Sequence, residues 1–375
     1  MAKSILVTST DLMMIQFLIP HIINLSKRGY IVDIACSNVG NKITDIKDIL
    51  DNFVNHFYVV RLHRNPINVD NLNGYFDMKN IMNIGNYDII WTNEPVMGVI
   101  TRLAARKKRK KGSTVIYMAH GFHFYKGAPK KNWLLYYPIE KFMSRYTDKL
   151  ITINHEDYEL AKNKFNCDVY HVHGVGVNSN RCFILPKDET AQIKRTLGLD
   201  KDDKIILNVG ELLPNKNQKT AILAMTKVVK IIPNSKLLIA GNGILKEELQ
   251  ELIDKHSLND NVKLIGYTTE INKYMNICDL LVACSFREGL PLNLMEAMLC
   301  GKFIVASKNR GHNELITNGV NGYLFDPDNA DELANLIINA LNNTNINKDK
   351  ILELVNPYID KNVVDELANI YELEK

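Results

Sequence analysis

The feature of this sequence that most constrains its fold is a regular alternation of short β-branched runs with amphipathic segments of helical length. Strands separated by helices of this length pair in parallel, and a parallel sheet is normally covered by helices on both faces. The runs expected to form strands are 4–8, 31–35, 57–60, 88–91, 114–118, 149–153 and 169–172, and then 204–209, 236–240, 262–265, 279–283, 302–305 and 322–325.

The chain is long enough for two domains of this kind. It has 375 residues, of which 46% are hydrophobic and 23% charged, an ordinary globular composition. The alternation breaks at 174–186, where glycines and polar residues gather. The sequence therefore predicts an α/β protein with two doubly wound Rossmann-like domains, 1–180 and 181–375, facing each other across a cleft. The segments from Asp328 onward are long enough for the final helix to cross back to the first domain.

Positive charge is concentrated in the first half. Residues 1–180 contain 23 basic and 15 acidic residues, whereas the remainder has 23 basic and 27 acidic residues. Between Thr101 and Leu150, 13 residues are basic, and the only acidic residues are Glu140 and Asp148. Such a patch predicts an anionic partner for the first domain: lipid headgroups, a phosphorylated substrate or nucleic acid.

The six cysteines are scattered, and no Cys/His cluster has metal-ligand spacing. They are typical of reduced core residues in a cytosolic protein. No stretch of about 18 apolar residues is present to span a bilayer, and the first apolar run fits a strand better than a secretion signal. The motif Asp326-Pro-Asp328 follows a late strand, so helix capping explains it. We expect no essential metal and no cofactor.

The most informative stretch, 284–298, directly follows the strand 279–283 and contains Glu288 and Glu296 separated by seven residues. Gly289 permits an unusual backbone, and Pro291 suits the first turn of a helix. Free N–H groups at that helix start would bind an anion. The predicted anion site comprises Gly289, Leu290, Pro291, Leu292 and Asn293. The alternative is that both glutamates are ordinary solvated residues of a helix start.

Two further loops follow strands of the second half. In the first, Gly210 and the turn after it deliver Lys216 to a helix start, where an ammonium can neutralise a diphosphate. In the second, Gly241 and Gly243 allow close backbone approach. A solvated lysine and a structural turn are the corresponding alternatives. Because ligands bind beyond the carboxyl ends of parallel strands, these loops are expected at one site.

Together these three loops resemble the donor half of the GT-B glycosyltransferases, and most closely the family 4 retaining transferases of bacterial polysaccharide biosynthesis. Glu288 and Glu296 match that family's paired-glutamate motif, and Tyr267 matches a position expected beside the base. The resemblance covers the second domain well and the first only in outline. It implies retention of configuration and a nucleotide-sugar donor, with Glu288 catalytic and Glu296 on the ribose. Many members have arginine where this chain has Glu211, so Lys216 would act alone or with Arg287.

In the first domain, His120 follows the strand 114–118 and resembles the family's cleft histidine near the donor sugar. We assign His120 a catalytic role, with His123 second and counted among the acceptor contacts. The loop 9–14 lacks the glycine pair of many relatives, and Thr10 and Asp11 are predicted acceptor contacts there. A lone histidine is otherwise most often structural.

Seven of the ten residues from 102 to 111 are basic, and 130–146 interleaves bases with aromatic residues on a predicted helix. This pattern suits the headgroup layer of an anionic membrane. The predicted membrane patch comprises Arg106, Lys107, Lys108, Arg109, Lys110, Lys111, Lys130 and Lys131. Nucleic acid is disfavoured because no nucleic-acid-binding module accompanies the patch; a merely solvated face is the other alternative.

We therefore expect a cytoplasmic glycosyltransferase, peripheral at the inner face of the cell membrane. It would move a sugar from a nucleotide-sugar, with UDP as the expected nucleotide, to a lipid-linked oligosaccharide in capsule or exopolysaccharide biosynthesis. One alternative is a UDP-sugar 2-epimerase of the same architecture, which would need no lipid-facing basic surface. The other is an inactive transferase-like membrane scaffold, which only Glu211 favours.

Overall fold

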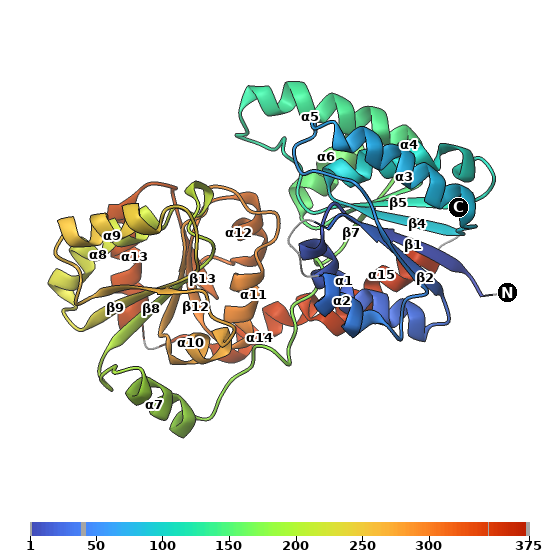
Figure 1. Cartoon of the computed structure of the whole chain (residues 1–375). Helices are drawn as coiled ribbons and strands as arrows, with labels where there is room; N and C mark the ends of the chain where they lie inside the picture. Colours follow the sequence, from blue (N-terminus) through green and yellow to red (C-terminus); the bar gives the residue numbers. More distant parts are fainter. Residues whose placement is uncertain (1, 39–42, 344, 373–375) are drawn as a thin grey trace. The chain divides into compact units, whose positions relative to one another are not determined.

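The computed structural model describes residues 2–38, 43–343 and 345–372. The chain divides into two compact units: the first contains the residues up to Gly176 together with those from Asp360 on, and the second is Val177–Ile359. The sequence placed the boundary at 180, a few residues later. Each unit contains one parallel β-sheet, and Figure 1 draws both.

The first unit has a seven-stranded parallel sheet in the order β3-β2-β1-β4-β5-β6-β7. Its elements are β1 (Ser4–Thr8), α1 (Leu12–Lys27), β2 (Ile31–Cys36), α2 (Ile43–Leu50), β3 (His56–Val59), α3 (Asp70–Ile84), β4 (Ile89–Asn93), α4 (Pro95–Arg109), β5 (Thr114–Ala119), α5 (Lys130–Met143), the 3₁₀ turn Ser144–Tyr146, β6 (Lys149–Thr152), α6 (His155–Lys164), β7 (Asp168–His171) and α15 (Asp360–Glu372).

Helices cover both faces of this sheet, as expected for a buried parallel sheet. α3, α4 and α5 lie on one face, with α4 in contact with both of the others, and α1, α2 and α15 lie on the opposite face (Figure 1). α15 is the last helix of the chain, yet it belongs to this unit. Its Tyr371 ring lies 5.2 Å from that of Trp91, and the Lys149 ammonium donates to the Ile370 carbonyl at 2.8 Å.

The second unit has a six-stranded parallel sheet in the order β10-β9-β8-β11-β12-β13. Its elements are α7 (Lys187–Thr196), β8 (Lys204–Val209), the 3₁₀ turn Pro214–Lys216, α8 (Gln218–Ile231), β9 (Ser235–Ala240), α9 (Lys246–Lys255), β10 (Val262–Gly266), α10 (Ile271–Ile277), β11 (Leu280–Ala283), α11 (Leu292–Leu299), β12 (Phe303–Ser307), α12 (Arg310–Leu315), β13 (Gly322–Phe325), α13 (Ala330–Asn342), α14 (Lys348–Val355) and the 3₁₀ turn Asn356–Tyr358.

Two apolar cores, one on each face, hold this sheet. Buried side chains of α8, α9 and α13 form one, and those of α10, α11 and α14 form the other. Every predicted strand is present, within two residues of its expected bounds, because fully buried strands carry the long apolar runs that the sequence shows. The predicted fold class, two Rossmann-like α/β domains, is confirmed. The carboxyl ends of β8, β9 and β11 are therefore where a ligand site is expected.

Candidate functional site

The loops after β8 and β9 pack backbone against backbone through glycines. A Cβ added to Gly241 would lie only 1.9 Å from the Gly210 carbonyl oxygen, and one on Gly243 would lie 2.4 Å from that of Leu212. The Leu212 N–H donates to the Asn242 carbonyl at 2.9 Å across the same contact. No other residue type fits such an approach. The predicted glycines thus join two loops into one floor at the strand ends.

Lys216 and Glu288 form an ion pair beside this floor. The Lys216 ammonium lies 2.7 Å from a Glu288 carboxylate oxygen, and the lysine stem passes directly under Gly210. Burial alone would raise the pKa of Glu288, but the Lys216 charge and hydrogen bonds from Lys216 and Ser285 hold that pKa below its usual value. The structure therefore brings together two residues that the sequence assigned separately, one to the diphosphate and one to the sugar.

The loops that carry this pair are themselves tied together. The Phe286 N–H donates to the Asn215 carbonyl at 2.8 Å, and the Asn215 side-chain amide donates to the Arg287 carbonyl at 3.0 Å. A Cβ on Gly311, which is in α12, would lie 2.8 Å from the Glu288 Cβ. Gly311 therefore lets α12 approach the Glu288 loop, a role that its sequence context did not reveal.

Glu296 is the fifth residue of α11 and faces a hollow of about 310 Å³. The hollow is lined by Arg181, Val209, Gly210, Glu211, Ala240, Gly241, Asn242, Tyr267, Thr268, Ile271 and Glu296. Burial raises the pKa of Glu296, opposed by the Arg181 guanidinium, whose Nε lies 3.7 Å from the carboxylate. The predicted residues Gly210, Gly241, Tyr267 and Glu296 thus surround one hollow, joined by Arg181 and Thr268, which the sequence analysis did not single out.

The start of α11 differs in detail from expectation. The helix begins at Leu292, so Pro291 precedes it rather than occupying its first turn. Gly289 is not among the described glycines with positive φ. The Asn293 side chain donates to the Val209 carbonyl at 2.8 Å, which fixes the helix start against the end of β8. Asn293 therefore lies in the first turn of α11 and holds that turn against β8.

His312 is a candidate that the sequence analysis missed. It is fully buried in α12, its Nδ1 lies 2.7 Å from the Ser307 carbonyl, and its Nε2 has no hydrogen-bond partner among the described residues. Burial lowers the pKa of His312 to about 4, so the ring is neutral at physiological pH. The spacing to Glu288 along the chain gave no signal, because only the packing of α12 on that loop brings the two together.

In the first unit, His120 stands at the carboxyl end of β5, as predicted. Its Nε2 lies 3.0 Å from the Asn93 side-chain oxygen, and burial, with His21 nearby, lowers the pKa of His120 to about 4. Glu94, which follows Asn93 in the chain, has φ 64° and ψ 155°, a strained backbone conformation for a non-glycine residue. Its carboxylate accepts from the Ser9 hydroxyl at 2.6 Å. β1, β4 and β5 are neighbours, so these side chains share one edge of the sheet.

Three predicted acceptor contacts have structural partners. Thr10 is 3% exposed, and its N–H donates to Glu94 at 2.9 Å. Asp11 is 1% exposed, caps α1 and pairs with Arg64 at 2.6 Å. The His123 ring stacks on Tyr136 with centroids 4.7 Å apart, facing α5. Thr10, Asp11 and His123 thus each help to hold a loop or helix start of the first unit, and their role as acceptor contacts stays a prediction.

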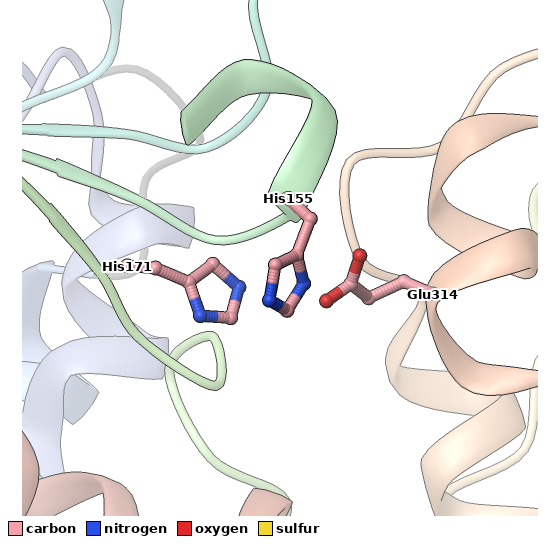
Figure 2. A group of neighbouring side chains, drawn as sticks. All are labelled: His155, His171 and Glu314. Atoms are coloured by element: carbon pink, nitrogen blue, oxygen red, sulfur yellow. The ribbon is translucent and has the colours of Figure 1, made fainter. Parts of the chain in front are cut away.

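Two histidines that the sequence placed apart meet at the end of β7 (Figure 2). His155 begins α6 and His171 ends β7, and their ring centroids are 4.1 Å apart. The nearby His173 Nδ1 lies 3.1 Å from the Glu366 carboxylate of α15. Figure 2 also labels Glu314, which belongs to α12 of the second unit. The sequence gave no sign of this histidine cluster, since parallel pairing of β6 with β7 sets the positions.

The predicted membrane patch divides into two groups. Lys108 donates to the Gly85 carbonyl at 2.9 Å, and Arg109 pairs with Asp148 at 3.1 Å, so these two hold α4 to its neighbours. The remaining residues are exposed: Arg106, Lys107, Lys110, Lys111, Lys130 and Lys131. The exposed surface charge is thus smaller than the sequence count suggests.

Comparison with known proteins matches both units. Residues 6–154 match the family model "Glycosyl transferase 4-like", and residues 189–352 match "Glycosyl transferases group 1". The protein EpsD of Bacillus subtilis strain 168, named as a glycosyltransferase, is 40% identical over 275 residues, covering 73% of this chain and 72% of EpsD. The "UDP-Gal:alpha-D-GlcNAc-diphosphoundecaprenol alpha-1,3-galactosyltransferase" of Escherichia coli is 25% identical over 357 residues, which cover 94% of this chain and 88% of that protein.

Solved structures agree on the fold. HepE of Anabaena, crystallised in complex with UDP, superposes with a TM-score of 0.81 over 98% of this chain and 99% of its own, at 19% sequence identity. This likeness extends over both units. Since the sequence relatives and both family models agree, the chain belongs to the glycosyltransferases of the GT-B fold, with a glycosyltransferase-4-like first unit and a group 1 second unit.

Proposed function

We propose that this glycosyltransferase moves a sugar from a UDP-sugar to a hydroxyl of a lipid-linked oligosaccharide during cell-surface polysaccharide synthesis, with retention of configuration. The observation that carries the proposal is the hollow of about 310 Å³ with Glu296 on its wall and the Lys216–Glu288 pair beside its Gly210 floor. The Lys216 cation suits a diphosphate, Glu296 suits a ribose diol and Glu288 suits the hydroxyls of a sugar, while the glycine backbone leaves room for them.

Each group has a proposed role in this site. Lys216 and the α11 start neutralise the departing diphosphate, the main electrostatic task of the transfer. Glu296 accepts hydrogen bonds from the ribose diol, Tyr267 lies beside the base, and Glu288 contacts the transferred sugar. Because Lys216 is paired with Glu288 at 2.7 Å, the diphosphate would compete with that carboxylate for the ammonium. Glu211 lines the hollow in place of the family's arginine, so Arg287 is the proposed second cation.

His120 is proposed to act as a neutral hydrogen-bonding group near the reacting sugar. Its lowered pKa keeps the imidazole uncharged at physiological pH, and its contact with Asn93 orients the ring. The donor and acceptor assignments are supported by the names of relatives: the Escherichia coli relative takes UDP-Gal and a diphosphoundecaprenol-linked sugar, and HepE was crystallised with UDP.

We propose that the enzyme acts at the cytoplasmic face of a membrane. Within the part of the chain that the structure describes, no helix has both the length and the apolar character needed to span a bilayer. The exposed bases at the end of α4 and the start of α5 would contact anionic headgroups. Nucleic acid is not proposed as a partner.

Thermal stabilisation by nucleotides tests the donor site. UDP, GDP, CDP, ADP and NAD are compared, each with EDTA, on the wild type, on Lys216→Ala and on the control Lys219→Ala. Lys219 is exposed on the neighbouring helix α8. We expect UDP to raise the melting temperature of the wild type and the control, and Lys216→Ala to lose most of that shift. No stabilisation by any nucleotide, or stabilisation by NAD alone, contradicts the proposal.

The same experiment tests metal independence, which we also propose because Lys216 and backbone N–H groups supply positive charge for the diphosphate. Stabilisation that persists in EDTA supports this. If UDP stabilises the wild type in a parallel sample without EDTA but not in the sample with EDTA, metal independence is wrong. Turnover by the purified chain, with a UDP-sugar and a lipid-linked acceptor, separates a working transferase from an inactive scaffold.

A further inference from the structure

The outer face of α5 is apolar, which its basic sequence context concealed. Leu134 is 76% exposed, Leu135 60%, Ile139 48% and Phe142 49%. Their spacing places them on one stripe of the helix. The inner side of the same helix packs its aromatic residues on the first unit, as the 5.4 Å between the Tyr137 and Phe124 rings indicates. α5 therefore buries one apolar side and leaves a second one uncovered.

Positive charge frames this stripe at both ends. Lys130 and Lys131 are exposed at the start of α5, and Lys141 and Arg145 are exposed at its end. The acid of this helix, Glu140, is buried and paired with Arg102 at 2.8 Å, so it does not reach the surface. The exposed face thus combines large apolar side chains with cations alone.

The apolar surface continues toward α3. The Arg106 guanidinium lies 5.5 Å from the Tyr146 ring, which in turn lies 5.6 Å from the Phe142 ring of α5. On its other side, Arg106 lines a groove of about 590 Å³ with Ile67, Val69 and Leu72. Those three residues are 87%, 80% and 62% exposed. α4 separates α3 from α5 on this face of the sheet, and Figure 1 shows the three helices together.

We propose that this surface, the α5 stripe with the groove at 66–72, inserts its apolar side chains into the headgroup boundary of an anionic phospholipid bilayer. The inference rests on the proposed function, in which the acceptor is lipid-linked. It adds that apolar insertion, and not charge alone, holds the enzyme there. An interfacial element needs an apolar face plus cations at its rim, and this surface has both without an exposed acid on α5.

Vesicle sedimentation tests the proposal. Vesicles of phosphatidylcholine alone and with phosphatidylglycerol are mixed with the wild type and with Leu134→Gln/Leu135→Gln. The control is Ile231→Gln/Ile244→Gln, which alters residues of the second unit that are 56% and 80% exposed. Glutamine keeps a helix propensity close to that of leucine, so α5 should fold in the variant.

We expect the wild type and the control to bind the anionic vesicles, and the α5 variant to bind them at least about tenfold more weakly. We also expect part of the wild-type binding to survive high salt, which screens the charges but not the insertion. Equal binding by the α5 variant would overturn the proposal. So would a change of oligomeric state in that variant with vesicle binding intact, which would assign the surface to a second copy.

Stabilisation by UDP, measured on the same samples, keeps this test separate from the donor assignment. It should be the same in the wild type, the control and the α5 variant. Loss of vesicle binding with UDP stabilisation retained supports the insertion. If the wild type binds vesicles but no nucleotide stabilises it, the membrane surface is supported and the proposed function is overturned.

Discussion

Two ion pairs, one in each unit, have nearly the same length but differ in how far their side chains are exposed to solvent. Arg102 and Glu140 in the first unit lie 2.8 Å apart with side chains only 1% and 7% exposed. Lys216 and Glu288 in the second unit lie 2.7 Å apart but are 26% and 15% exposed. The first pair is enclosed between helices, whereas the second stands in loops at the ends of parallel strands.

The difference lies in how completely each pair is enclosed. The Arg102 Nε donates to the Gly98 carbonyl at 2.8 Å, its Cζ lies 3.9 Å from the centre of the Tyr117 ring, and the Tyr117 hydroxyl donates to Glu140 at 3.2 Å. Such a closed network leaves nothing for a ligand. The Lys216 side chain remains partly open to solvent, and in the proposed function a diphosphate would take the place of its carboxylate partner. The comparison shows that an ion pair at strand ends can be left accessible to a ligand, whereas an ion pair between helices is closed off.

The largest expected effect breaks the enclosed pair. Arg102→Met leaves Glu140 buried without a countercharge, and we expect it to lower the free energy of unfolding by about 3–5 kcal/mol. Arg102→Met/Glu140→Leu should recover much of that loss because no buried charge remains. Urea unfolding followed by circular dichroism compares the two. If the double variant is as unstable as the single one, the pair contributes through packing and not through charge.

Breaking the open pair should affect catalysis more than stability. We expect Glu288→Gln to lower turnover by a factor of about 10²–10³, the scale of losing one electrostatic contact in a transition state. Its cost to the free energy of unfolding should be smaller than that of Arg102→Met, because the Lys216–Glu288 pair is less completely buried. Steady-state kinetics and urea unfolding of the same variant measure both. An instability as great as that of Arg102→Met would erase the contrast between the pairs.

A moderate effect is expected from the protonation of Glu296. Burial raises the pKa of this carboxyl, so it gains a proton at a higher pH than an ordinary glutamate. UDP binding that uses the carboxylate as acceptor should therefore weaken as the pH falls from about 7.5 through that pKa, by about twofold at the pKa and about tenfold one pH unit below it. Isothermal titration calorimetry of UDP at several pH values tests this. Glu296→Gln should bind more weakly but without the pH dependence, and an unchanged pH profile in that variant would assign the titration elsewhere.

The smallest effect is expected for the surface ion pairs that join α15 to Arg28 at the end of α1. Arg28 lies 3.0 Å from Asp365 and 3.3 Å from Glu372, with all three side chains at least one-third exposed. We expect Arg28→Ala to lower the free energy of unfolding by no more than about 1 kcal/mol. Hydrogen exchange of α15 should be nearly unchanged, since buried Leu367 and Tyr371 hold the helix. Rapid exchange throughout α15 in the variant would show that these charges anchor it.

Much of the second unit could be predicted from the sequence, because its signals are local. The run 279–283, the glycine directly after β8 and β9, and the spacing of Glu288 and Glu296 lie within short windows. The roles of polar loop residues in the first unit were harder to predict, because their partners are distant along the chain. Asp11 was predicted as an acceptor contact, yet its side chain caps α1 and meets Arg64, a residue 53 positions away. A polar residue in a loop has the same local signature in either role.

The sequence by itself determined the two parallel sheets, the order of their elements and the loops that carry the candidate donor site, since hydrophobic periodicity and turn residues act over a few neighbours. Only the tertiary structure decided the pairing of Lys216 with Glu288, 72 positions apart, and the strained backbone of Glu94. It also decided that α5 turns Leu134 and Leu135 outward. These outcomes depend on which elements pack together, and burial is a property of that packing and not of any single residue.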